Sequence, residues 1–139
     1  MRHLRTWPAA LTLLTLLFLT VLAAGYASGA SPERRVEIHI HYSHFEPSAL
    51  AVPRGVAVTF VLINDDPIDH EWLIGDAAFH DRHRRGTETQ HGARPNEISI
   101  PALSTVETTL AFAETGTVQY ICHFPGHEAY GMVGTLTVE

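Results

Sequence analysis

The amino-acid sequence predicts an all-β protein, a Greek-key β-sandwich of two sheets with about seven or eight strands. Two observations support this prediction. Apolar and polar residues alternate with a period of two in several short segments, which is typical of strands with one buried face. Turn-forming residues separate these segments, as they do in β-sandwiches. With 139 residues, the chain is long enough for one domain at most.

The first half of the domain contains four predicted strands. Alternation begins at Val36 and continues to Tyr42, and residues 48–52, between two prolines, form a short edge strand. Residues 56–63 repeat the alternation up to a cluster of turn formers. A short apolar segment at 72–74 is the fourth strand and ends at a glycine.

Residues 76–95 interrupt the strand pattern. They are rich in charged residues, histidine and glycine, and they have no apolar periodicity. We therefore expect one long loop of about 20 residues, which exceeds the usual loop length inside a compact domain. A loop of this length is either functional or mobile. Alternation then returns in four further segments, at residues 98–100, 106–112, 116–122 and 132–138.

The N-terminus is typical of a secretory signal. Arg2 and Arg5 precede an apolar run over residues 9–24, and small residues at 28–30 offer a cleavage site. We therefore expect a signal at residues 1–30, a mature domain at 31–139 and a periplasmic or extracellular location. The alternative is an uncleaved membrane anchor, but the run is shorter than the ~20 residues that a spanning helix needs.

The charge of the mature chain excludes some partners. Without Arg2 and Arg5, seven of the nine basic residues remain against 15 acidic residues, so the net charge is −8 with histidine neutral. Such an acidic chain is a poor ligand for nucleic acids and for anionic membranes. The single cysteine, Cys122, also excludes an intrachain disulfide and a four-cysteine zinc site.

Three possible metal ligands follow one another near the C-terminus. Cys122, His127 and Met132 have the spacing C-x4-H-x4-M, between two predicted strands. Soft sulfur favours Cu(I), imidazole suits both oxidation states, and a weak axial thioether completes a mononuclear copper site. A second histidine must come from another strand. His70 is the candidate, because it follows the strand at 56–63 and opens the next apolar segment.

This pattern resembles the cupredoxin family of small blue copper proteins, such as plastocyanin, azurin and rusticyanin. The resemblance covers nearly all of residues 35–139 and is carried by residues 116–122, the Pro125-Gly126-His127 turn, Gly131-Met132 and residues 134–138. It implies that His70, Cys122, His127 and Met132 hold one Cu(I)/Cu(II) ion. Glu71 is a departure, because plastocyanin and azurin have an asparagine there that helps to tie the ligand loops together. Periplasmic cupredoxins with a His-Glu pair, some of them associated with copper tolerance, are the most similar.

The resemblance implies outer-sphere electron transfer at a type 1 copper site. His127 is then the exit edge for the electron, and Phe124, Pro125, Ala129 and Tyr130 form an apolar rim for a transient redox partner protein. No nucleophile–base pair is evident in the sequence, so we do not expect an enzyme. We expect a monomer, with membrane contact only if the N-terminal segment is uncleaved.

Two other functions remain open from the sequence. The first is copper tolerance, in which the protein binds or oxidises excess copper and His80, His83 and His91 form an accessory capture site. The alternative for these histidines is that they are simply solvated in an arginine-rich segment. A second copper site on the strand that carries His39 and His41 is a further candidate. The other function is a copper-free structural or receptor module, against which the complete ligand set argues. His123 is expected to point away from the copper, in a structural role.

Overall fold

The computed structural model describes residues 34–86 and 94–139. The predicted signal at residues 1–30 and one predicted accessory ligand, His91, lie outside these ranges. Within the described part of the chain, no helix has the length and apolar character needed to cross a membrane.

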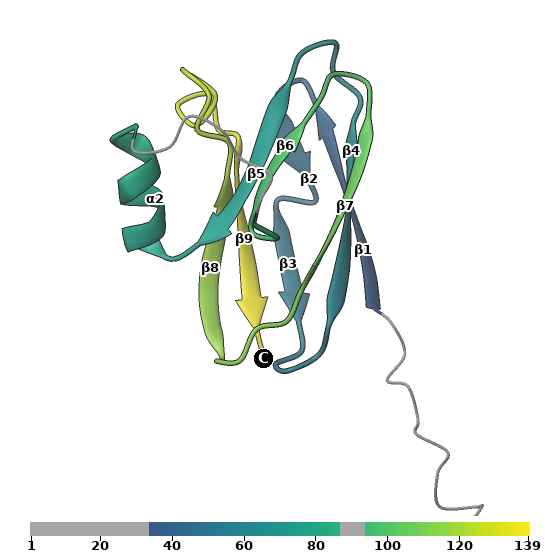
Figure 1. Ribbon diagram of the computed structural model, residues 1–139, viewed down its shortest axis with the longest axis vertical. Helices are drawn as coiled ribbons and strands as arrows, with labels where there is room; N and C mark the ends of the chain where they lie inside the picture. Colours follow the sequence, from purple (N-terminus) through teal and green to yellow (C-terminus); the bar gives the residue numbers. More distant parts are fainter. Residues whose placement is uncertain (1–33, 87–93) are drawn as a thin grey trace, which may run out of the picture. The chain divides into compact units, whose positions relative to one another are not determined.

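The described residues form nine strands in two sheets (Figure 1). One sheet has the order β2-β1-β4-β7, and the other has the order β3-β9-β8-β5-β6. The strands are β1 (Arg34–His41), β2 (His44–Glu46), β3 (Ala49–Val52), β4 (Val58–Asn64), β5 (His70–Gly75), β6 (Glu97–Ile100), β7 (Thr105–Leu110), β8 (Gly116–Ile121) and β9 (Val133–Val138).

Several neighbouring strands are distant in sequence, as a Greek-key arrangement requires. β1 pairs in parallel with β4, and β3 pairs in parallel with β9, whereas β5, β8 and β9 pair antiparallel in the second sheet. The chain therefore passes repeatedly between the sheets. The predicted two-sheet β-sandwich is confirmed.

One strand was not predicted. β2 follows a two-residue turn in which Tyr42 and Ser43 have φ values of 51° and 57°. Positive φ at both central residues is the geometry of the tight hairpin turn that matches the twist of antiparallel strands. Neither residue is glycine, so the sequence lacked the usual signal for this turn.

The core lies between the two sheets and is dominated by aromatic side chains. Trp72 and Tyr120, from adjacent strands, are fully buried, and Phe60 packs on Trp72 from the opposite sheet with ring centroids 5.1 Å apart. The Tyr120 hydroxyl donates a hydrogen bond to the carbonyl of Pro47 at 2.7 Å. Core packing thus holds the ring of Tyr120, and the hydrogen bond holds its hydroxyl.

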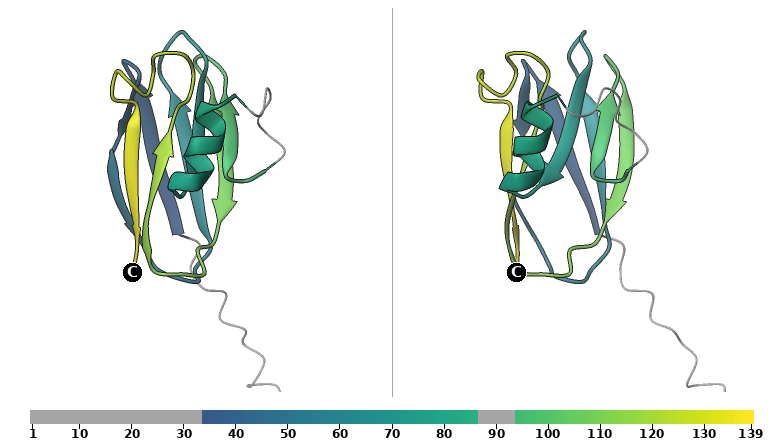
Figure 2. Two further views of the ribbon diagram at one scale, coloured as in Figure 1. Left: turned by 90° about the vertical axis from the view of Figure 1, so that its left-hand side faces the viewer. Right: turned by 60° about the vertical axis from the view of Figure 1, so that its left-hand side comes forward.

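The prediction of a continuous loop over residues 76–95 was wrong for its first part. Residues Ala77–Arg84 form the helix α2, which lies on the outside of the five-stranded sheet near β5 and β8 (Figure 2). Asp76 caps its N-terminus by accepting a hydrogen bond from the backbone N–H of Phe79 at 2.8 Å. Only Phe79 and His80 of this helix are buried. An eight-residue helix with so small a buried face has no clear apolar periodicity. The sequence pattern therefore did not distinguish this helix from a loop.

The start of β5 and the segment between β8 and β9 lie at the same end of the sandwich (Figure 1). This follows from the pairing of the strands, because Leu73 faces Ile121 across β5 and β8, and Ile121 faces Val133 across β8 and β9. The C-terminus lies at the opposite end. The topology therefore gathers the predicted copper ligands at one end of the molecule.

Candidate metal centre

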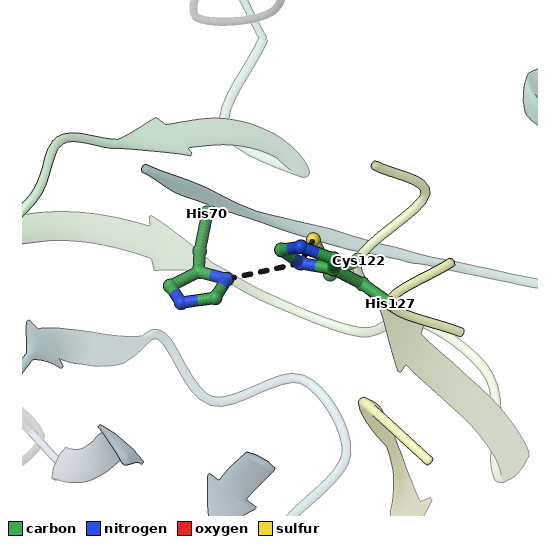
Figure 3. A group of neighbouring side chains, drawn as sticks. All are labelled: His70, Cys122 and His127. Atoms are coloured by element: carbon green, nitrogen blue, oxygen red, sulfur yellow. Dashed lines mark hydrogen bonds between the residues drawn. The ribbon is translucent and has the colours of Figure 1, made fainter. Parts of the chain in front are cut away.

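Three predicted ligands meet at the end of the five-stranded sheet. His70 begins β5, Cys122 follows directly after β8, and His127 lies in the loop before β9. The Sγ atom of Cys122 lies 3.4 Å from Nδ1 of His127, and Nδ1 of His127 lies 3.2 Å from Nδ1 of His70 (Figure 3). The ligating atoms all lie within 4.8 Å of one another. They face a common point, as the ligands of one ion must.

Met132, the fourth predicted ligand, is fully buried beside this cluster. Its backbone N–H donates to the carbonyl of His127 at 3.0 Å, and its own carbonyl accepts from the N–H of Cys122 at 3.2 Å. These two bonds close the loop between β8 and β9. They hold the methionine, the cysteine and the second histidine in one hydrogen-bonded unit.

Local hydrogen bonds shape the ligand loop. The N–H of His127 donates to the carbonyl of Phe124, and the N–H of Tyr130 donates to the carbonyl of Gly126, both at 3.0 Å. Gly126 has a φ of 88°, a conformation that other residues rarely adopt. The Pro125-Gly126 turn therefore sets the position from which the His127 ring reaches back to Cys122.

Asp66 orients the first histidine. The Nε2–H of His70 donates to the Asp66 carboxylate at 3.0 Å, which leaves Nδ1 of His70 as the basic nitrogen facing the cluster. Burial raises the pKa of Asp66, but hydrogen bonds from Ser43, Tyr42 and His70 outweigh it and lower the pKa below its usual value. A carboxylate behind a ligating histidine is a common supporting contact in metal sites. In the sequence, Asp66 belongs to the cluster of turn formers that follows residues 56–63, so its role at the site was missed.

We expect Asp66→Asn to weaken copper binding by about 10–100-fold, the usual effect of losing such a supporting contact. The amide N–H of asparagine would donate to Nε2 of His70. That contact favours the tautomer in which Nδ1, the atom that faces the copper centre, carries the hydrogen. The measurement is a competition titration of copper against a chelator. Asp65→Asn is the matched control, because Asp65 contacts the exposed ring of His39 rather than a ligand. Equal affinities of the two variants would contradict the orienting role.

The electrostatics of the cluster suit a soft metal ion. Burial raises the pKa of the Cys122 thiol to about 11, although N–H groups of Phe124 and Glu71 oppose this shift. Burial, followed by the proximity of His70, lowers the pKa of His127. The thiol is therefore protonated until a cation replaces the proton, so metal binding releases a proton. Two imidazoles, a thiol and a thioether in a compact cluster form a donor set that fits copper.

Glu71 connects the two strands that carry the ligands. Its side chain is only 2% exposed, and its carboxylate accepts a hydrogen bond from the backbone N–H of His123 at 2.7 Å. The carboxylate thus links β5 to the residue that follows Cys122. At this position the carboxyl group of Glu71 makes the link between the ligand segments that asparagine makes in plastocyanin and azurin.

His80 and His123 form a contact that was not predicted. His123 points away from the copper ligands, as expected, and its Nε2 lies 2.9 Å from Nδ1 of His80. The alternative that the histidines of residues 76–95 are simply solvated is therefore wrong for His80, which is completely buried. His83 lies on the same helix and donates from Nδ1 to the carbonyl of Phe79 at 2.9 Å.

Two histidines of β1 and β2 have hydrogen-bond partners of their own. His39 meets the Asp65 carboxylate at 2.9 Å, and His44 donates to the carbonyl of Tyr42 at 2.7 Å. Within the described residues, the cluster of His70, Cys122 and His127 is the one group of three or more His, Cys, Asp or Glu ligands close enough to share an ion. A second copper site at His39 and His41 of β1 stays a prediction.

Comparisons with known proteins agree with this centre. Residues 33–139 match the model of a family described as copper binding proteins of the plastocyanin/azurin family. The chain is 28% identical to the copper-resistant cuproprotein CopI of Pseudomonas aeruginosa, with 97% of each chain covered. It is 32% identical to the protein of the same name from Rubrivivax gelatinosus, over 68% of this chain and 59% of that protein.

Two solved structures share the fold. Auracyanin B superposes with a TM-score of 0.65 at 24% identity, covering 81% of this chain and 93% of that chain. Auracyanin A, a "blue" copper protein from the bacterium Chloroflexus aurantiacus, has a TM-score of 0.59 at 27% identity, covering 76% of this chain and 98% of that chain.

Proposed function

Because the chain belongs to the plastocyanin/azurin family of copper-binding proteins, we propose that it is a type 1 copper protein that works in outer-sphere electron transfer. The observation that carries this proposal is the compact cluster of His70, Cys122 and His127, with Met132 in the same hydrogen-bonded loop as Cys122 and His127. When bound, copper supplies the Cu(I)/Cu(II) couple. The cluster contains the ligand types that both oxidation states accept.

The protein scaffold limits how far the ligands can move. His70, Cys122 and Met132 are fully buried, and each is held by strand pairing or by backbone hydrogen bonds. Asp66 fixes the His70 ring, and Glu71 links its strand to the segment after Cys122. A rigid donor set of this kind supports electron transfer, because little has to rearrange when the charge at the site changes.

The surface around His127 supports a route for the electron. His127 is half-buried, whereas the other three ligands are completely buried. Its neighbours include Pro125, Ala129 and Tyr130, all exposed, and the Tyr130 side chain is 76% exposed. An apolar rim around the most accessible ligand suits the transient docking of a redox partner protein. In this proposal the protein is an electron carrier and not an enzyme.

Export is part of the proposal. The positive start, the apolar run at residues 9–24 and the small residues at 28–30 support a secretory signal. We place the mature protein in the periplasm or outside the cell, where it acts as a monomer.

Copper tolerance is the second candidate function. Its support is the similarity to the copper-resistant cuproproteins of P. aeruginosa and R. gelatinosus. In this role the protein would bind excess copper or oxidise Cu(I), and histidines of the segment 76–95 would take part in capture. Oxidation of Cu(I) at the expense of oxygen would make the protein an oxidase.

One experiment tests the copper site and separates the two functions. The purified apoprotein is titrated with Cu(II) while visible absorption and electron paramagnetic resonance are recorded. We expect an intense thiolate-to-copper band that saturates at one equivalent, with a narrow parallel hyperfine splitting. The reduced protein should then give up one electron per chain to hexacyanoferrate(III).

The contrary results are equally specific. A protein that binds copper without an intense band has no type 1 site. Sustained oxygen consumption in the presence of excess Cu(I) would replace electron transfer by copper oxidation as the main function. Buffer with the same Cu(I) concentration and no protein is the control.

A further inference from the structure

The helix α2 extends from the outside of the five-stranded sheet toward the ligand loop between β8 and β9 (Figure 1). Its N-terminal half is anchored on the sheet. Phe79 is buried, and its ring lies so close to β5 that a Cβ atom on Gly75 would be 2.6 Å from it. Nε2 of His80 lies 3.1 Å from the carbonyl of Gln119 on β8. Two strands therefore fix the position of the helix.

Arg84, the last residue of α2, contacts the ligand loop. Its Nε lies 3.0 Å from each carboxylate oxygen of Glu128, and its Nη2 donates a further hydrogen bond to the same group. Its Nη1 donates to Asp81 at 2.7 Å. A planar guanidinium that binds a carboxylate through two nitrogens fixes geometry as well as charge. Glu128 directly follows His127, so Arg84 acts one residue away from a copper ligand.

A second contact between α2 and the loop lies one helical turn earlier. Nδ1 of His80 lies 2.9 Å from Nε2 of His123, the residue that follows Cys122. His80 and Arg84 lie on one face of α2, because residues four positions apart in a helix are neighbours. Both loop residues that this face contacts therefore come directly after a copper ligand.

Close apolar packing does not join the end of α2 to the loop. Among the described residues, a groove of about 530 Å³ lies between them, lined by residues of both, including His83, Gly86, Phe124 and Gly126. Side chains that face such a groove cannot hold the loop by filling the space. The polar contacts across the groove are therefore the ones that set the position of the loop relative to the helix.

We propose that α2 is a brace for the copper-ligand loop, and that Arg84 is a positioning residue that holds His127 through Glu128. The proposal rests on the proposed function in one respect, since His127 is taken to be a copper ligand. His127 is only half-buried, whereas the other three ligands are completely buried, so its position depends most on its own loop. The brace limits how far the His127 ring moves when the charge at the site changes.

The first measurement needs no copper. Amide hydrogen exchange of the apoprotein is compared between the wild type, Arg84→Gln and Arg35→Gln. Arg35 is the matched control, because it also binds both oxygens of a carboxylate, that of Glu107 across β1 and β7, outside the ligand loop. We expect Arg84→Gln to speed exchange of the His127 and Tyr130 amides about 2–5-fold, as loss of a surface ion pair allows, while amides of β9 keep their rates. Arg35→Gln should leave the loop amides unchanged.

Lysine at residue 84 separates the shape of the side chain from its charge. It keeps the positive charge but cannot bind a carboxylate through two nitrogens. We expect Arg84→Lys to speed exchange in the loop as Arg84→Gln does. If lysine keeps the wild-type rates, charge alone is sufficient and the positioning role is overturned. Unchanged loop amides in Arg84→Gln, or equal acceleration of the loop and of β9, would also overturn it.

The second measurement tests the effect on the metal centre. Electron paramagnetic resonance of the Cu(II)-loaded Arg84→Gln protein should give broader parallel hyperfine lines than the wild type, because the position of His127 varies more between molecules. Electron self-exchange between the Cu(I) and Cu(II) forms, followed by NMR line broadening, should be slower. Arg35→Gln should match the wild type in both. Wild-type spectra and rates in Arg84→Gln would overturn the positioning role, even if the loop amides exchange faster.

A double variant tests whether Arg84 acts through Glu128. In a Glu128→Gln background, Arg84→Gln should have little further effect on loop exchange or on the hyperfine lines. A full effect in that background would mean that Arg84 acts by another route, and would overturn the proposal. Failure of the proposed function is seen separately, as a wild-type protein without the intense thiolate-to-copper band. In that case, hydrogen exchange of the apoprotein still decides whether α2 holds the loop.

Discussion

Replacing Cys122 by serine is expected to abolish the intense visible band of the copper-loaded protein. That band arises from charge transfer between the thiolate and copper, and the chain contains a single cysteine. A serine hydroxyl is a hard donor that stays protonated near neutral pH, so it cannot replace the thiolate. Copper held only by the remaining donors would give a weak absorption and a wide hyperfine splitting. Visible absorption and electron paramagnetic resonance of the loaded variant measure this.

The control for this change is the fold of the apoprotein. Serine is close to cysteine in size, so the apo-variant should keep its circular dichroism spectrum and a cooperative unfolding transition. His44→Ala is the matched surface variant: Nε2 of His44 lies near Gly131 in the ligand loop, but Nδ1 is bound to the Tyr42 carbonyl. It should keep the full band. An intensely coloured Cys122→Ser protein would refute the thiolate assignment.

Replacing Gly134 by alanine is expected to lower the free energy of unfolding by about 1–3 kcal/mol or more, the usual cost of overpacking. A Cβ atom at this position would lie 2.0 Å from two ring carbons of Tyr120, its direct partner across β8 and β9. The Tyr120 ring cannot move away easily. The centroid of the Phe45 ring lies 5.2 Å from its own, and the Tyr120 hydroxyl donates a hydrogen bond to the carbonyl of Pro47. Urea unfolding of the apoprotein measures the change.

A double variant separates this clash from a loss of strand propensity. Tyr120→Leu removes the ring and is itself destabilising, but it leaves room for a methyl group at residue 134. In the Tyr120→Leu background, Gly134→Ala should therefore cost much less than it does in the wild-type protein. If the cost is the same in both backgrounds, the Tyr120 ring is not the reason for the glycine.

The copper ligands could be predicted because their chemistry is visible in the chain. Cys122, His127 and Met132 lie within eleven residues, and a thiolate, an imidazole and a thioether at this spacing have few other interpretations. His70 was harder, because it lies 52 residues before Cys122. The strand that it opens identified it, and the structure places its Nδ1 3.2 Å from Nδ1 of His127.

The groups that support the ligands could not be predicted in the same way. Asp66 looked like a turn residue, and it is one, since it accepts backbone hydrogen bonds from Tyr42 and Ser43. Its second role depends on where the His70 ring points, which is a property of the folded chain. The same holds for α2, whose short buried face of Phe79 and His80 left no periodic signal.

The sequence by itself determined the two-sheet architecture and the type of metal site. Alternation with a period of two is a local property of each strand, and the soft donors are concentrated in one short loop, so neither depends on distant contacts. Only the tertiary structure decided which groups stand behind the ligands and that His80 faces His123. His80 and His123 are 43 positions apart, and their distance is set by how β5, α2 and β8 pack. Asp66 is only four residues from His70, but their contact depends on the direction in which the folded chain points the His70 ring. Packing of this kind has no counterpart in the local pattern of the chain.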